Sequence, residues 1–146
     1  NQYFETFPTL ARYLDSIKAE TARRGYTETY FGRRRYFEGI KSKIPYIRAS
    51  FERMAINAPI QGTEADIVKL AMVKVEEYFI KEKLEKEAFP LLQVHDEVVY
   101  EIKEDKAPMI STEIKKIMEG IIPPEKIRGI TLAVKVSIGK NWGEMH

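Results

Sequence analysis

Apolar residues recur every three or four positions in four segments of the chain, and this spacing predicts four helices. Pro8 suits a first helical turn, Gly25 follows the basic pair that closes the first helix, and Gly120 ends the last. The apolar stripe of the third helix is interpreted as core packing, not as a cofactor site. The predicted helices cover residues 7–24, 42–58, 63–80 and 105–119, after a lead-in over residues 1–6.

Proline and small polar residues set the expected helix boundaries. Ser42 and Asp105 can cap the helices that follow them, because their side-chain oxygens accept backbone N–H groups of a first turn. Pro59 lacks an amide hydrogen and is expected to interrupt the second helix. A new helix is then expected at Thr63, with Thr63 as its cap and Asp66 in its first turn.

Alternation of apolar and polar residues predicts three strands. Leu91–Val94 and Val98–Ile102 are apolar or β-branched and are expected to form a hairpin joined at His95-Asp96. Residues 130–138 alternate regularly and are interpreted as a half-buried strand. The predicted fold class is α+β, a small antiparallel sheet of hairpin 91–102 plus strand 130–138 backed by helices.

Charge is distributed unevenly over a chain whose net charge is only +2. Residues 1–60 carry eleven Lys or Arg against six Asp or Glu, and residues 61–146 carry thirteen against sixteen. With 146 residues and 44% hydrophobic content, we expect one compact unit with a basic helical part over 1–60 and a second part over 61–146. The basic half suits a phosphate backbone and the acidic half a cation site, although such charge blocks are commonly solvated faces.

The composition excludes disulfides, because the chain has no cysteine. It also contains no apolar run of about 18 residues, and no apolar signal core opens it. The expected location is therefore the cytoplasm, and no membrane partner is expected.

The polar tip of the predicted hairpin is a candidate site. A carboxylate such as that of Asp96, held by two strands and open to solvent, suits a hard cation such as Mg²⁺. Aspartate is also an ordinary turn residue, because its side chain can bond the backbone two residues on. Taken alone, an aspartate in the position of Asp96 is more often structural than catalytic.

The loop or short hairpin expected over residues 25–39 carries three adjacent arginines, Arg33, Arg34 and Arg35. Only Glu28 and Glu38 lie nearby in the sequence, so neighbours cannot pair all three. A solvated turn and a contact with nucleic-acid phosphates are both open on these residues.

Three blocks resemble, in the same order, sequence motifs of family A DNA polymerases, the DNA polymerase I type. They are Gly25–Tyr36, Arg53–Asp66 and the run Gln93-Val94-His95-Asp96-Glu97. The resemblance covers essentially the whole chain, but only the C-terminal part of the family's polymerase domain, namely the end of the fingers plus the palm. The blocks that carry the family's first metal-binding Asp and its nucleotide-binding helix have no counterpart in this sequence.

The resemblance implies template-directed DNA synthesis by a two-metal mechanism, in which a dNTP is added to a primer 3′-hydroxyl with Mg²⁺ as cofactor. Asp96 is the implied metal ligand and Glu97 a nearby acid that assists the site. His95 and Gln93 are expected beside the primer terminus, and the three arginines on DNA. Implied partners are primer-template DNA, dNTP, and the remaining polymerase portion or a complementary subunit, without which we expect little or no activity.

Arg53, Asn57 and Gln61 follow one another at intervals of four residues. On a helix this spacing puts Arg53 and Asn57 on one face, while the alignment of Gln61 depends on the helix at Pro59. Such donors can contact the acceptors that every base pair presents in the minor groove. Asn57 alone fits a helix end equally well, and the resemblance implies DNA contact at all three positions.

Other functions are alternatives. The chain could be a non-catalytic DNA-binding module that keeps the helix residues, or a split-polymerase subunit. A single-subunit RNA polymerase fits less well, because in the resemblance Glu97 is typical of the DNA enzymes and Ser of the RNA enzymes. A two-histidine hydrolase would need more histidines than His95 and the C-terminal His146.

Overall fold

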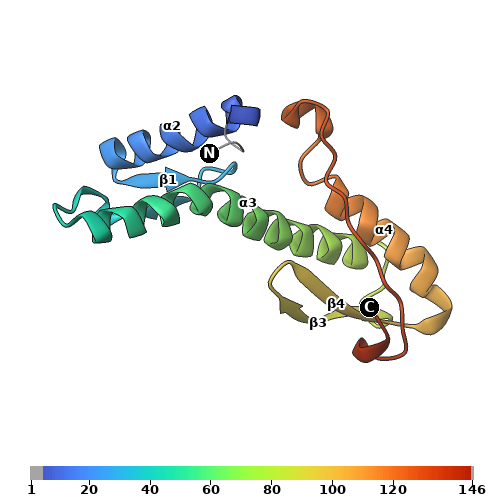
Figure 1. Ribbon diagram of the computed structural model, residues 1–146. Coiled ribbons are helices and arrows are strands. Elements are labelled where there is room, and N and C mark those ends of the chain that lie inside the picture. The colour runs from blue at the N-terminus through green and yellow to red at the C-terminus, as the bar shows by residue number, and fades with distance from the viewer. Residues whose placement is uncertain (1–4, 146) are drawn as a thin grey trace. The chain divides into compact units, whose positions relative to one another are not determined.

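The computed structural model describes residues 5–145; Asn1–Phe4, the first part of the predicted lead-in, and His146 lie outside the described residues. The described chain is a mixture of helices and two antiparallel two-stranded sheets, which confirms the α+β fold class. It divides into a unit that ends at Asp66 and a unit that begins at Ile67. The helices are α2 (Pro8–Arg24), α3 (Pro45–Lys81) and α4 (Ala107–Glu119), and the strands are β1 (Tyr26–Glu28), β2 (Arg34–Tyr36), β3 (Ala88–Val94) and β4 (Glu97–Ile102), as Figure 1 shows.

Helix α3 is unbroken from Pro45 to Lys81, so the predicted interruption at Pro59 and the restart at Thr63 are wrong (Figure 1). A proline inside a helix removes one backbone hydrogen bond and costs roughly 3 kcal/mol. In the turns around Pro59, Ala55 and Ala58 are buried, and the Thr63 hydroxyl donates to the Pro59 carbonyl at 2.6 Å. Burial of this part of the helix offsets the local cost, and Thr63 bonds within the helix instead of capping a new one.

The core of the first unit lies between α3 and the 3₁₀ turn Glu38–Lys41. It consists of Phe37, Ile40, Ala55 and Ala58, with Phe51 and Met54 packed against them. Helix α2 begins at Pro8, one residue after the predicted start, and ends as predicted at Arg24, where Gly25 follows with a φ of 83°. At the start of α2 the apolar positions are exposed, namely Phe7 at the N-cap position and Leu10 in the helix, so helical spacing of apolar residues does not mark a buried face there.

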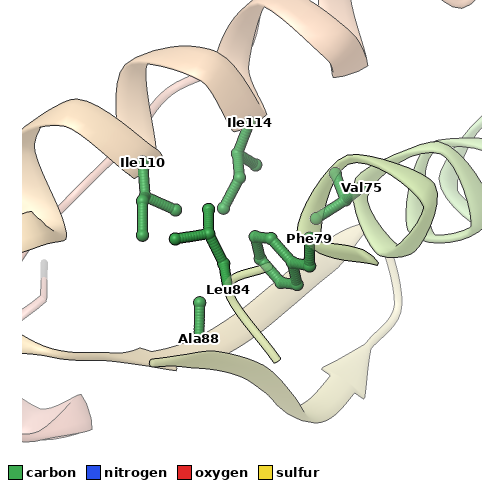
Figure 2. Close-up of a cluster of buried hydrophobic side chains, with 6 residues drawn as sticks. All are labelled: Val75, Phe79, Leu84, Ala88, Ile110 and Ile114. Atoms are coloured by element: carbon green, nitrogen blue, oxygen red, sulfur yellow. The ribbon is translucent and has the colours of Figure 1, made fainter. Parts of the chain in front are cut away.

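The core of the second unit joins α3, the hairpin and α4. Figure 2 shows side chains from these elements pointing toward one another around Phe79, which is 1% exposed. The ring of Phe79 meets that of Tyr100 edge to face, with centroids 5.9 Å apart. As predicted, the apolar stripe of the third predicted helix, now part of α3, packs into a core, and residues of α4 complete it. The buried members of this core are Val75, Phe79, Leu84, Ala88, Ile110 and Ile114.

Strands β3 and β4 form the predicted hairpin, with His95 and Asp96 as its two-residue loop. The pairing extends further than predicted, over Ala88–Val94 and Glu97–Ile102. The register shifts at Leu91, which is an extra residue on β3 and forms a β-bulge. The bulge lies between the buried end of the hairpin and its tip.

No strand forms over residues 130–138, so the predicted third strand of the sheet is wrong. The segment is attached to α4, because the backbone N–H of Val134 donates to the Glu119 carboxylate at 3.0 Å. Ile130 and Ile138, on the alternating apolar face, are mostly exposed. Alternation predicts extended backbone, but a strand also requires backbone pairing, and residues 130–138 pair with neither strand of the described hairpin.

Two predicted caps differ in detail. Asp105 lies in the 3₁₀ turn Glu104–Lys106 and makes no cap, because α4 begins after it with Lys106 at the N-cap position. Ser42 accepts a hydrogen bond from the N–H of Ile44 at 3.2 Å, just before α3 begins. Among the described helices, none combines the length and apolar character needed to cross a lipid bilayer.

Candidate functional site

The tip of the β3–β4 hairpin is held in a specific backbone conformation. His95 has a φ of 54°, which matches the sign required at the first position of a type II′ hairpin turn. A non-glycine residue with positive φ costs on the order of 1 kcal/mol or more. The side-chain amide of Gln93 donates to the His95 carbonyl at 3.0 Å, and this bond helps to hold the loop.

The acids of the tip are available to a ligand. Asp96 and Glu97 are exposed, and within residues 5–145 neither makes an ion pair or a side-chain hydrogen bond. In the same residues no group of three His, Cys, Asp or Glu side chains comes together as a metal site. One or two carboxylates suit Mg²⁺, which commonly keeps several waters and takes further oxygens from substrate phosphates. The tip therefore fits a cation only as part of a larger ligand set.

Arg53, Asn57 and Gln61 lie on one exposed face of α3. The continuity of the helix through Pro59 decides the alignment that the sequence left open, because residues four apart on an unbroken helix are neighbours on its surface. Three polar side chains with hydrogen-bond donors thus form a row two helical turns long.

The three adjacent arginines make three different sets of contacts. Arg33 donates from Nε to the Asp66 carboxylate at 2.7 Å and from Nη2 to the Gly62 carbonyl at 3.0 Å. Asp66 is therefore committed inside α3 and does not sit in a first helical turn.

Arg34 pairs with Glu28 at 2.8 Å across the β1–β2 ladder, and its guanidinium lies 4.6 Å from the centre of the Tyr26 ring. The hydrogen bond to Glu28 is the main reason why the pKa of Arg34 is raised above its usual value. Arg35 is exposed, lies over the Phe37 ring, and makes no ion pair within the described residues.

A cavity of about 200 Å³ brings three of the predicted residues together: Arg33, Arg35 and Gln61. Its walls come from the β1–β2 hairpin and from one face of α3. The lining is completed by Thr27, Thr29, Ala58, Gly62 and Ala65.

A larger depression, of about 480 Å³, is lined by residues of α3 and α4 and holds no predicted site residue. Each of its three lysines has an acidic neighbour: Lys74 pairs with Glu77, Lys81 with Glu82 and Lys116 with Glu113. We therefore assign the candidate chemistry to the smaller cavity and to the hairpin tip.

Sequence reasoning missed the polar partners that attach the β1–β2 hairpin to α3. The partners on α3 are the Thr63 hydroxyl, the Gly62 carbonyl and Asp66, which lies 33 residues from Arg33. The available signal was the surplus of arginines over local acids, which indicated a distant partner without identifying it.

The exposed acidic hairpin tip and the polar face of α3 lie in two of the sequence blocks that resemble polymerase motifs, and comparison with known proteins gives the same family. The chain belongs to DNA polymerase family A, whose family model matches residues 1–144. It is 41% identical over 141 residues to the thermostable DNA polymerase I of Thermus aquaticus, and 40% identical over 146 residues to the DNA polymerase I of Pseudomonas aeruginosa.

The structure is also similar to a solved one, the POL domain of Pol1 from M. smegmatis in complex with DNA primer-template and dNTP. The TM-score is 0.89 at 35% identity, and the match covers 99% of this chain and 24% of that chain. The two DNA polymerase I matches cover 97% and 100% of this chain, but 16% and 15% of the length of those relatives. The chain thus corresponds to a part of a polymerase.

Proposed function

We propose that this chain forms the palm part and the adjoining end of the fingers of a template-directed DNA polymerase. The observation that carries the proposal is the paired β3–β4 hairpin whose tip exposes Asp96 and Glu97, in a chain of DNA polymerase family A. In the proposed reaction a primer 3′-hydroxyl attacks the α-phosphate of a dNTP, and pyrophosphate leaves.

The proposed metal ligand is Asp96, with Glu97 as an assisting acid. When bound, two divalent cations supply positive charge that stabilises the attacking and leaving oxygens. The chain's own contribution is rigidity, because β3 and β4 fix the tip and the Gln93 amide holds the His95 carbonyl. The exposed imidazole of His95 is proposed to hydrogen-bond the primer end.

The proposed DNA-binding surface lies in the first unit. Arg53, Asn57 and Gln61 offer donors for the minor-groove acceptors that all base pairs share, so they can test pair geometry without reading sequence. Arg35, which has no ion pair within the described residues, is proposed to contact a DNA phosphate. Arg33 and Arg34 are held by carboxylates of the chain itself, so their part in DNA binding is indirect.

The proposed site is completed by an acid and a nucleotide-binding helix from outside these residues. We therefore expect the 146-residue chain to extend a primed template with Mg²⁺ and dNTP barely or not at all. Robust extension by the chain alone would contradict this part of the proposal.

The test of the catalytic role is Asp96→Ala in a completed polymerase domain, in which this chain is joined to the upstream portion of the domain. We expect extension to fall by at least about 10³-fold, since the variant loses a charge that acts in the transition state. Binding of primer-template DNA, measured by fluorescence anisotropy, should stay within about twofold. Unchanged extension would instead favour a non-catalytic DNA-binding module.

A further inference from the structure

The turn of α3 from Pro59 to Thr63 is attached to the β1–β2 hairpin at Gly62 and Thr63, the two residues directly after Gln61. The Thr63 hydroxyl accepts the backbone N–H of Tyr30 at 2.9 Å while it donates to the Pro59 carbonyl at 2.6 Å. The Gly62 carbonyl accepts from Arg33 at 3.0 Å. Gln61 thus projects from a turn whose backbone and hydroxyl groups are bonded to a neighbouring element.

Arg33 is the strongest of these attachments. Its bond to Asp66 is charge-assisted and short, at 2.7 Å, and the Asp66 side chain is only 11% exposed. The two bonds from Arg33 reach positions 62 and 66, one helical turn apart on α3. The planar guanidinium therefore fixes the hairpin against that turn in both distance and orientation.

Close packing supports the same attachment. A Cβ atom at Gly62 would lie 2.7 Å from the Thr29 methyl carbon, so glycine is required for the hairpin to lie this close to α3. The Thr29 hydroxyl in turn accepts the backbone N–H of Arg33 at 3.1 Å. Thr29, Arg33 and Gln61 line the same cavity.

We propose that Arg33 is a positioning residue, which acts through Asp66 and the Gly62 carbonyl to hold the turn of α3 that carries Gln61. The inference rests on the proposed DNA contact of Gln61. Held in this way, Gln61 would discriminate between matched and mispaired primer ends. A hydrogen-bond donor fixed in one place can bond a correct primer-terminal pair but not a displaced, mispaired one. Of the three adjacent arginines, Arg33 is thus assigned to the geometry of the site and Arg35 to the phosphate charge.

The experiment is a double-mutant cycle in the completed polymerase domain, read as the ratio of kcat/KM for matched and mispaired primer ends. Gln61→Ala and Arg33→Ala are each expected to lower this ratio by about tenfold, the loss of roughly one hydrogen bond. The double variant should lower it no further than either single variant, because Arg33 acts through Gln61. Multiplied effects in the double variant would overturn the inference and leave the proposed function intact.

Salt dependence separates positioning from phosphate binding. The affinity for DNA falls as salt rises. Arg35→Ala should make the slope of log affinity against log salt shallower by about one, as expected for one lost phosphate contact. Arg33→Ala should leave that slope unchanged, and an equal reduction would overturn the inference. Arg48→Ala is the matched control, because it removes an arginine whose partner is an exposed i+4 glutamate.

A steric pair provides a test that removes no charge. Gly62→Ala should lower the discrimination ratio, because its methyl group pushes against the Thr29 methyl group. Thr29→Ser in the same chain should restore the ratio, since serine lacks that methyl group and keeps the hydroxyl that accepts the Arg33 N–H. Failure of this rescue, with both variants folded by circular dichroism, would contradict the inference.

Two further results of these experiments need their own interpretation: a variant that does not fold, and a Gln61 substitution without effect. If Arg33→Ala does not fold, Arg33→Lys replaces it, since lysine keeps the charge but cannot make the same two directed bonds. If Gln61→Ala itself leaves discrimination unchanged, the proposed DNA contact of Gln61 is wrong and this inference falls with it.

Discussion

In the unit that ends at Asp66, long-range polar contacts hold the candidate residues, whereas in the unit that begins at Ile67 an apolar core and a strand register hold them. A two-stranded hairpin is attached to α3 by Arg33, which bonds Asp66 and the Gly62 carbonyl, and by the Tyr30 N–H, which donates to Thr63. The acidic tip, in contrast, extends from a hairpin whose other end is packed around Phe79. The difference teaches that the first arrangement depends on a few directional bonds, while the second is distributed over many apolar contacts.

The largest expected effect on stability comes from a substitution at the centre of the core of the second unit. Phe79→Ala should lower the free energy of unfolding by about 3–5 kcal/mol, because it removes a buried ring and leaves a cavity. Urea unfolding of the chain measures the loss, and hydrogen exchange should localise it to α4 and the hairpin. Val73→Ala on the same helix is the control, since Val73 is 55% exposed and should cost well under about 1 kcal/mol. Equal losses from both variants would show that the Phe79 cluster is not the core.

A smaller effect is expected in the first unit. Arg33→Ala should cost about 2 kcal/mol, the range for hydrogen bonds to a charged group. Hydrogen exchange should increase at the Tyr30 N–H, which depends on the same attachment of the hairpin to α3. Arg48→Ala, with an exposed ion pair, should cost less than about 0.5 kcal/mol. Faster exchange in α4 instead of at Tyr30 would contradict the proposed division of contacts.

The smallest effect concerns pH and the core of the second unit. Burial, with a further contribution from Glu76, raises the pKa of Tyr100 to about 12 from its ordinary value of 10.0. Below pH 10 both folded and unfolded states keep the proton, so this group does not alter stability there. Between pH 10 and 12 the unfolded state releases the proton first, and stability falls as pH rises.

After allowance for the partial exposure of Tyr100, the loss should be on the order of 1 kcal/mol. Comparing the pH dependence of urea unfolding for the chain and for Tyr100→Phe measures it. The variant should lose this part of the decline, and identical pH profiles would show that Tyr100 is not the responsible group.

The parts of the fold that could be predicted are those set by local pattern. The hairpin tip followed from two apolar runs around a polar pair, and the stripes of α3 and α4 followed from helical spacing. Residues 130–138 have an equally regular alternation and form no strand, because pairing depends on a neighbour that a pattern does not reveal. Local pattern predicts the face that a segment presents, not the element that will cover it.

The parts that could not be predicted depend on distant residues. Pro59 is a strong stop signal, but burial of Ala55 and Ala58 keeps α3 continuous through it. The pairing of Arg33 with Asp66 links two positions 33 residues apart, and Asp66 was expected in the first turn of a new helix. The errors at Pro59 and Asp66 have one physical cause, since tertiary contacts outweighed a local preference of a few kcal/mol.

The bulge at Leu91 has a consequence for how such a hairpin can change. A bulge carries one residue more on one strand while the pairs on either side stay intact. Insertions or deletions at the bulge would change the direction of the outer half of the hairpin without disturbing the packing around Ala88. The position of the acidic loop can therefore be changed, by natural variation or by engineering, without changing the stability of the packed end of the hairpin.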